Sequence, residues 1–508
     1  MKPSIVAPLL LILSLPVWSQ AVFPGLENDP QAAEFARRGT NGAYSWQDLA
    51  EIALWASTVQ TGNSVSASPG KGQPPYVALI TAAAEELASA PDLPQTDREK
   101  GEYVLEFIHK KFLKTYSLLQ TRVDTILASG RYNCVSSAVL YLIFARSAGL
   151  DVQGVMTKDH AFIAVNIDGN FIDVETTNPY GFDPGNRKDF HDGFGKVTGF
   201  AYVPANNYRD RSSISPIELV SLILSNRIAD LEKQRHFGEA VPLAVCRAGL
   251  LAGRQGAASS AFFEDPQRDL VTRISNYGAS LIQAGKENDA LRWAVTASTK
   301  YPGEDRLNEL TFAAMNNSLV KLMKQGRIAE ARDLLTAHAA QLRSEKFDQL
   351  ETMIIDTELL DRASKIKETD EAETILAAID RAAGKNQLSP ERAGELRTFA
   401  VEKTAALLAA AGSAGSRTDA GSGRRNWPAA IKYIEAAAVR YGSNRQLEKS
   451  LQNYRNNWAA EFHNSFASAY NKKNFDEAAR ILGEGLNMFP DNRQLLSDKN
   501  IIDKTGKQ

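Results

Sequence analysis

Cysteine is scarce in this sequence, where Cys134 and Cys246 are the only two among 508 residues. Two cysteines are too few for a disulfide framework or a cysteine-rich zinc site. An excess of one charge is also lacking, because 58 Lys and Arg stand against 60 Asp and Glu. This balance argues against nucleic-acid binding through a basic surface. No nucleotide loop, dinucleotide fingerprint, serine nucleophile elbow or metal-ligand spacing is visible, so we expect no cofactor and no metal.

Long apolar runs are lacking as well. The apolar stretch from Ile5 to Val17 holds about 13 residues, whereas a membrane-spanning helix needs about 20. It follows Lys2 and precedes a small-x-small sequence at 19–21, which is the pattern of a secretory signal peptide. We therefore predict a signal peptide over residues 1–21, a mature chain that begins near Val22, a periplasmic or secreted location, and no stable membrane insertion. The alternative is an uncleaved N-terminal anchor.

The spacing of apolar residues predicts an α+β region in the first part of the chain. Helical spacing runs from about Tyr44 to Gln120, and an apolar helix is predicted from Val135 to Ser147. Three short strands should follow, at 152–156, 161–167 and 171–174. Asp168 and Gly169 tolerate positive φ and predict a two-residue hairpin turn between the last two strands. Helices with a small antiparallel sheet make an α+β domain, which we place at 22–215.

From Pro216 onward the sequence is Ala-rich and has helical spacing, and one sequence motif recurs. Residues 426–450 align without gaps on residues 474–498, including an identical Asn-Arg-Gln-Leu. A small alanine marks each of six copies, at Ala240, Ala290, Ala331, Ala372, Ala430 and Ala478. The motif resembles the tetratricopeptide repeat, although its steps of 41 to 58 residues exceed the usual length of about 34. We expect helical repeats over 216–508 that bind a protein partner, with a flexible Gly/Ser loop at 412–425.

Cys134 stands at the start of the apolar helix, where unpaired backbone N–H groups and the helix dipole favour an anion. A thiol in that position is biased toward the thiolate, its reactive form. His160 opens the second strand and can serve as general base for a cysteine nucleophile. In the hairpin register, paired residue numbers sum to 337, so Glu175 lies diagonally beside His160 on the same face. Asp173 pairs with Ala164, two residues farther along, and is the fallback carboxylate.

The segment from Gly130 to Thr177 resembles the transglutaminase-like superfamily. In that family a cysteine opens an apolar helix, as Cys134 does here, and the helix ends in Ala-Gly-Leu. The family's usual motif over this stretch, H-A-W-x-x-V-x-I-D-G-K-W-x-x-V-D-P-T, aligns with HAFIAVNIDGNFIDVETT at 160–177. Glu175 stands where the family has Asp, Thr176 where it has Pro, and two phenylalanines replace tryptophans. The resemblance implies a papain-like core whose catalytic residues are Cys134, His160 and Glu175.

These observations together predict an α+β transglutaminase-like (papain-like) domain followed by an all-α helical-repeat domain. The implied chemistry is acyl transfer from a protein or peptide amide through a thioester of Cys134. Hydrolysis is expected ahead of amine cross-linking. The turn-rich segment 178–192 is a candidate wall of the substrate cleft, and His109 is interpreted as a solvated or packed helix residue.

Two other interpretations stay open at this point. One is a catalytically inactive scaffold or protein-binding module of the cell envelope, and another is a purely structural envelope protein built on the repeats. Cys246 lies in an apolar helical run and is interpreted as a core residue. A disulfide with Cys134 is the alternative, which export would permit and which would remove the nucleophile.

Overall fold

The computed structural model describes residues 23–40, 44–60, 76–185, 188–199, 203, 210–252, 262–411 and 425–505. The signal peptide expected at 1–21, the N-terminus expected near Val22, and all of the expected 412–425 loop except Arg425 lie outside the described residues. Contacts divide the chain into two compact units, Met1–Asn317 and Ser318–Gln508. The domain boundary expected at residue 216 falls inside the first unit, at the start of a helix.

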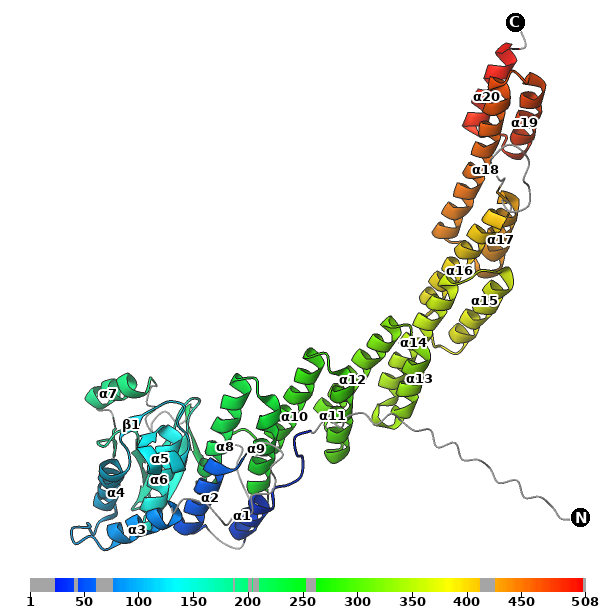
Figure 1. The fold of residues 1–508 in the computed structure, drawn as a ribbon. Helices are drawn as coiled ribbons and strands as arrows, with labels where there is room; N and C mark the ends of the chain where they lie inside the picture. The colour runs from blue at the N-terminus through cyan, green and yellow to red at the C-terminus, as the bar shows by residue number, and fades with distance from the viewer. Residues whose placement is uncertain are drawn as a thin grey trace, which may run out of the picture. The chain divides into compact units, whose positions relative to one another are not determined.

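Helices α1 to α12 begin in the first unit (Figure 1). They are α1 Pro30–Thr40, α2 Trp46–Thr58, α3 Tyr76–Ala88, α4 Asp97–Lys111, α5 Val123–Ser129, α6 Cys134–Ser147, α7 Lys188–Thr198, α8 Pro216–Lys233, α9 Phe237–Leu250, α10 Pro266–Gln283, α11 Glu287–Lys300 and α12 Asp305–Lys324. Local sequence explains where several begin. Helix α8, for example, starts with Pro216 in its first turn, and Ser215 and Glu218 form a capping box in front of it.

Helix α6 is the centre of the first unit. Twelve of its fourteen residues are buried, and it contacts α2, α4, α8 and the sheet. A helix that is apolar on every side is stable only inside a core, so its sequence dictates this place. Its first residue, Cys134, is thereby fixed at the edge of the core.

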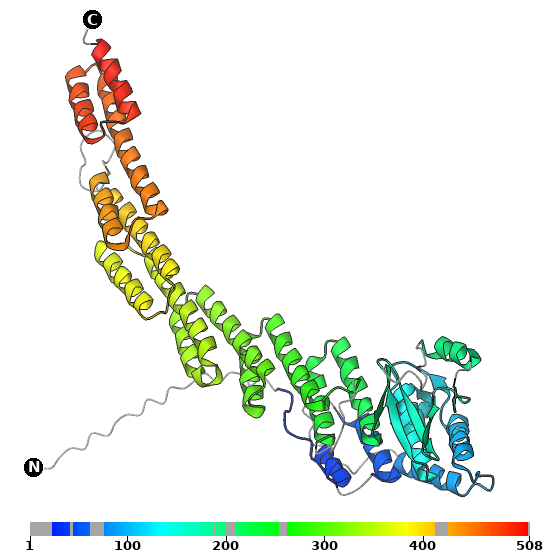
Figure 2. The same ribbon diagram turned by 180° about the vertical axis from the view of Figure 1, so that it is seen from behind.

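Two small sheets accompany these helices. Strands β1 (Thr115–Tyr116) and β2 (Arg131–Tyr132) form a parallel pair, and a four-stranded antiparallel sheet has the order β5-β4-β3-β6. Its strands are β3 Val152–Met156, β4 Ala161–Ile167, β5 Asn170–Val174 and β6 Ser212–Ile214. Figure 2 shows them as cyan to green arrows among the helices of this unit.

The predicted hairpin register is confirmed. Strand β4 pairs with β5 through Ala164 and Asp173, and through Ile163 and Val174. The turn residues Asp168 and Gly169 have φ values of 50° and 83°, as a two-residue hairpin of this kind requires. The residues that follow β5 are therefore placed on the expected face.

The expected fold class is wrong. Twenty α-helices make up most of the described chain, whereas the two sheets have only two and four strands. The sheet does not define an α+β domain of its own, because helix α8, expected to begin the repeats, packs on α2, α6 and β3. The sequence pattern located β3, β4 and β5, but it did not predict β1, β2 or β6. Strand patterns also carry no information on how many helices surround a sheet. The chain is predominantly helical, with a small sheet inside its first unit.

The second unit consists of helices. They are α13 Ile328–Ala337, α14 Ser344–Ser364, α15 Thr369–Gly384, α16 Pro390–Ala411, α17 Trp427–Tyr441, α18 Arg445–Asn471, α19 Phe475–Met488 and α20 Arg493–Thr505. Neighbours along the chain from α13 to α20 contact each other.

The six aligned alanines occupy one repeated structural position. Each is the fourth residue of an odd-numbered helix, from α9 to α19, and each is 0% exposed. A residue without bulk lets the neighbouring helix approach closely at that point. The recurring sequence motif therefore corresponds to a recurring pair of helices.

Candidate active site

Cys134 is the first residue of α6, and the residue before it closes the helix start. Asn133 Oδ1 accepts a hydrogen bond from Ser136 N at 3.0 Å, and Ser136 Oγ accepts one from Asn133 N at 3.0 Å. This reciprocal capping box satisfies one helical N–H group, and Ser137 N bonds to Asn133 O. The N–H groups of Cys134 and Val135 remain at the positive end of the helix dipole, available to an anion.

His160 lies just before strand β4 and faces Glu175, which lies just after β5. Its Nε2 is 2.6 Å from Glu175 Oε2. The two side chains are 2% and 0% exposed. The structure thus brings together the histidine and the carboxylate that the hairpin register placed on one face.

Thr177 holds the other oxygen of Glu175. Glu175 Oε1 accepts hydrogen bonds from Thr177 N at 3.1 Å and from Thr177 Oγ1 at 2.7 Å. Both carboxylate oxygens are therefore engaged, one by the backbone turn and one by His160. Because the carboxylate can only accept, it fixes a proton on Nε2 of His160 and leaves Nδ1 for exchange with another group.

The charge of Cys134 acts on His160 and contributes to the rise of its pKa. Burial lowers the pKa of His160, but the charges of Glu175 and Cys134 and the hydrogen bond to Glu175 raise it, so that the pKa is raised from 6.5 to about 10. The imidazole therefore stays protonated at neutral pH. Since Glu175 occupies Nε2, Nδ1 is the nitrogen that can exchange a proton with the thiol.

Asp173, the fallback carboxylate, is directed to a different partner. Arg211 donates hydrogen bonds to both of its oxygens, each at 2.7 Å. The same guanidinium lies 5.0 Å from the centre of the Phe162 ring. Asp173 and Arg211 therefore fasten the middle of β5, while Glu175 is the carboxylate at hydrogen-bond distance from His160.

Two residues that the sequence analysis did not assign to the site hold the strand end that carries Glu175. His109 Nε2 donates to Thr176 O at 3.0 Å, and Tyr132 Oη donates to Thr177 O at 3.2 Å. Burial lowers the pKa of His109 to about 4, although its bond to Thr176 opposes this, so it serves as a neutral donor. Helical periodicity shows that His109 is on α4 but not which strand end it reaches.

The turn after Glu175 depends on a close backbone approach. Gly181 O accepts from Glu175 N at 2.8 Å, and Gly181 N donates to Asn178 O at 3.0 Å. A Cβ at Gly181 would collide with the carbonyl oxygen of Glu175. The Asn-Pro-Tyr-Gly sequence at 178–181 is the turn signal that marks this requirement.

Aromatic side chains enclose His160. The ring centre of Phe162 lies 5.9 Å from that of His160, and the ring centre of Phe194, on α7, lies 5.1 Å from it. The candidate cleft wall at 178–192 instead pairs Phe182 with Val174 and packs Phe190 with Phe194. In this conformation the described part of that segment covers the sheet, and Cys134 is 6% exposed.

Cys246 is a buried residue of α9, and both cysteines have free thiols. Burial raises the pKa of Cys246 to about 12. The core interpretation is confirmed, and the alternative disulfide with Cys134 is absent from the structure. Cys246 therefore stays a neutral thiol at physiological pH.

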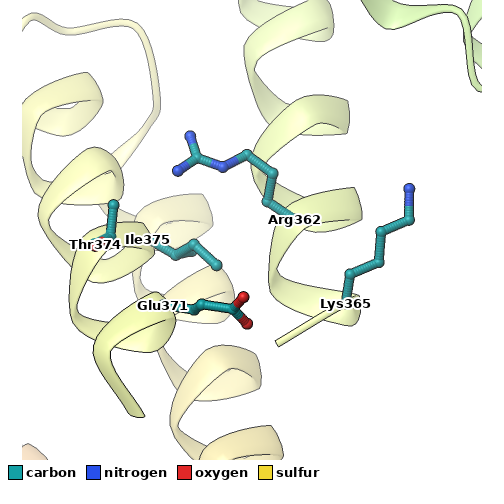
Figure 3. A pocket seen from close by; sticks show the side chains of 5 residues that line it. All are labelled: Arg362, Lys365, Glu371, Thr374 and Ile375. Carbon is teal, nitrogen blue, oxygen red and sulfur yellow. The ribbon is translucent and has the colours of Figure 1, made fainter. Parts of the chain in front are cut away.

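A hollow of about 320 Å³ occurs in the second unit (Figure 3). Its lining residues are Arg362, Lys365, Glu371, Thr374 and Ile375. Lys365 pairs with Asp361 at 2.8 Å on the exposed side of the helices. We assign no chemistry to this hollow.

Comparisons with known proteins do not identify a family. No family model matches the chain, and no curated protein matches it. Nine chains of solved structures match. One is menin, from a crystal structure described as revealing the binding site for the Mixed Lineage Leukemia protein, with a TM-score of 0.32, 12% identity, and coverage of 85% of this chain and 92% of that chain. A likeness at this TM-score carries no argument about this chain. Among the described residues, no helix combines the length and apolar character needed to cross a membrane.

Proposed function

We propose that this protein is an exported thiol enzyme in which Cys134 attacks a protein or peptide amide and His160 and Glu175 assist. The observation that carries the proposal is the 2.6 Å contact between His160 Nε2 and Glu175 Oε2 beside a cysteine at a helix N-terminus. The motif's resemblance to transglutaminase-like enzymes supports the same chemistry. The proposal concerns the site and not the fold class, which is predominantly helical.

The first half of the reaction forms a thioester. Cys134, whose proton has already passed to His160 Nδ1, attacks as the thiolate: its Sγ bonds to the amide carbonyl carbon, whose π electrons move to oxygen. The N–H groups of Cys134 and Val135 are placed to stabilise that oxyanion. As the oxyanion collapses, the C–N bond breaks and His160 protonates the leaving amine. Glu175 keeps the imidazole oriented and stabilises its charged form throughout.

The second half releases the acyl group. His160 takes a proton from water, the hydroxide oxygen bonds to the thioester carbon, and Cys134 leaves as the thiolate beside the protonated His160, which restores the starting state. An amine in place of water would give a cross-link. Water is the acceptor in this proposal, because it is the abundant nucleophile outside the cell. The repeated helices from α8 onward are proposed to bind a protein partner or the protein substrate.

A scaffold role is the second candidate, and one observation favours it. Cys134 and His160 are 6% and 5% exposed, so a substrate reaches them only if covering side chains move. In the scaffold interpretation the buried polar site is structural, and the helices alone carry function.

Labelling with iodoacetamide at pH 7, followed by peptide mass spectrometry, separates the two candidates. The enzyme predicts fast carbamidomethylation of Cys134 and none of Cys246, because the latter is a neutral buried thiol. His160→Ala should abolish the fast reaction at Cys134. Absence of labelling at Cys134 in the folded protein, or equal labelling with and without His160, contradicts the enzyme and favours the scaffold.

A further inference from the structure

Tyr116 is the second residue of the two-residue strand β1. Pairing with β2 holds this strand next to the candidate site. Strand β1 pairs in parallel with β2, with Tyr116 opposite Tyr132. Ser117 N donates to Tyr132 O at 2.7 Å, and the two tyrosine rings meet edge to face with centres 5.9 Å apart. Tyr132 precedes Cys134 by two residues, so this pairing holds Tyr116 beside the start of α6.

The loop that follows Tyr116 is tied to the same helix start. Asn133 Nδ2 donates to Leu118 O at 3.1 Å, and Ser136 Oγ donates to Gln120 O at 2.9 Å. The capping box of α6 therefore fastens this loop as well as the helix. These bonds hold the backbone that follows Tyr116 against the start of α6.

The Tyr116 hydroxyl differs from the other hydroxyls around the site. It is buried and has no hydrogen-bond partner among the described residues, whereas Tyr132 Oη donates to Thr177 O. Burial raises the pKa of Tyr116 far above its usual range, and the charge of Cys134 contributes more to this rise than that of Glu175. The phenol is thus a protonated donor close to the sulfur, and a buried donor without an acceptor costs free energy that a substrate oxygen would recover.

We infer that the Tyr116 hydroxyl is a catalytic oxyanion donor, which hydrogen-bonds the carbonyl oxygen of the amide attacked by Cys134 and acts with the N–H groups at the start of α6. The inference rests on the proposed function and names a further residue of the same site. The hydroxyl keeps its proton throughout the reaction. Its hydrogen bond strengthens as the carbonyl oxygen gains negative charge.

Two reagents test this role on the full-length protein: both modify the sulfur of Cys134, but only one of them reacts through an oxyanion. p-Nitrophenyl acetate acetylates Cys134 through a tetrahedral oxyanion, whereas methyl methanethiosulfonate reacts with the sulfur and forms no oxyanion. In Tyr116→Phe the acetylation rate should fall by about 10²-fold, the usual effect of losing one such donor. The methylthiolation rate should stay within about twofold of wild type, because the nucleophile is unchanged.

Tyr141→Phe is the matched control. Tyr141 is a buried tyrosine of α6, the helix that begins at Cys134, and its hydroxyl donates to Gly101 O at 2.9 Å. Its loss should lower thermal stability and leave the ratio of the two rates unchanged. Tyr116→Phe should instead melt at or above the wild-type temperature, because the hydroxyl that it removes makes no hydrogen bond.

The outcomes distinguish the inference from the proposed function. A fall in acetylation of less than tenfold, or a parallel fall in both rates, would overturn the role of Tyr116 while leaving the thiol enzyme intact. A wild-type Cys134 that reacts with neither reagent would contradict the proposed function itself.

Discussion

Replacing Glu175 by Gln keeps the shape of the site but removes one charge and one acceptor. Thr177 N and Oγ1 donate to one carboxylate oxygen, so the amide oxygen of the new side chain must stay on Thr177. The amide NH₂ then faces His160 Nε2, 2.6 Å from the replaced oxygen. A donor there forces Nε2 to become an acceptor and moves the imidazole proton to Nδ1, where it blocks uptake of the thiol proton. A wrong tautomer of this kind costs about 10⁴-fold in rate.

The assay is acetylation of Cys134 by p-nitrophenyl acetate, followed by mass spectrometry of the cysteine peptide. Glu175→Gln should lower the rate by about 10³- to 10⁴-fold at neutral pH, and a thermal melt should show that the protein remains folded. Asp173→Asn is the control, because Asp173 bonds Arg211; it should lower stability by about 1–3 kcal/mol and change the rate by less than tenfold. The reverse outcome, with Asp173 essential and Glu175 dispensable, would refute the assignment of the carboxylate.

Three further predictions concern pH, packing and processing. The pKa of His160 is raised from 6.5 to about 10, so its charged form stabilises the fold fully below pH 6.5, and this stabilisation is lost as the pH rises to about 10. The difference in urea-unfolding free energy between wild type and His160→Gln should therefore shrink over that pH range. A constant difference would contradict the raised pKa. Gly181→Ala should destabilise the fold by about 1–3 kcal/mol in urea unfolding, because the new Cβ would collide with the Glu175 carbonyl. Gly394→Ala is the control and should be neutral or stabilising, because a Cβ there meets nothing within 4 Å. Equal effects of the two substitutions would argue against the close approach at Gly181. N-terminal sequencing of the exported protein should begin near Val22, and a sequence that begins at Met1 would show that the signal peptide is not cleaved.

Local sequence signals predicted the geometry around His160 because each signal has one structural solution. Asp168 and Gly169 accept the positive φ of a two-residue turn, and that turn fixes every later pair of the hairpin. The sequence of α6 is apolar on most sides and offers no solvated face over its first twelve residues, so it placed Cys134 at the edge of a core. The recurring alanines likewise marked positions where helices meet closely.

Other features depend on partners that no local pattern names. Tyr116 lies in a strand of 2 residues, too short for any periodicity, and 18 residues before Cys134. Helix α8 is apolar on a face that fits another repeat helix as well as it fits α2, α6 and β3. The pattern therefore predicted the helix α8 correctly. It did not predict that α8 packs beside the sheet, and this packing is one reason why the expected fold class is wrong.

Trapping the acyl intermediate tests the central claim, that Cys134 is a nucleophile activated by His160. The protein would be mixed with p-nitrophenyl acetate, quenched in acid and digested, and the acetyl group located by mass spectrometry before and after treatment with neutral hydroxylamine, which cleaves thioesters. The account predicts a hydroxylamine-sensitive acetyl group on Cys134 in wild type, none on Cys246, and none at either position in His160→Ala. The account would be contradicted if wild-type Cys134 carried no acetyl group, or if Cys134 were acetylated to the same extent in His160→Ala.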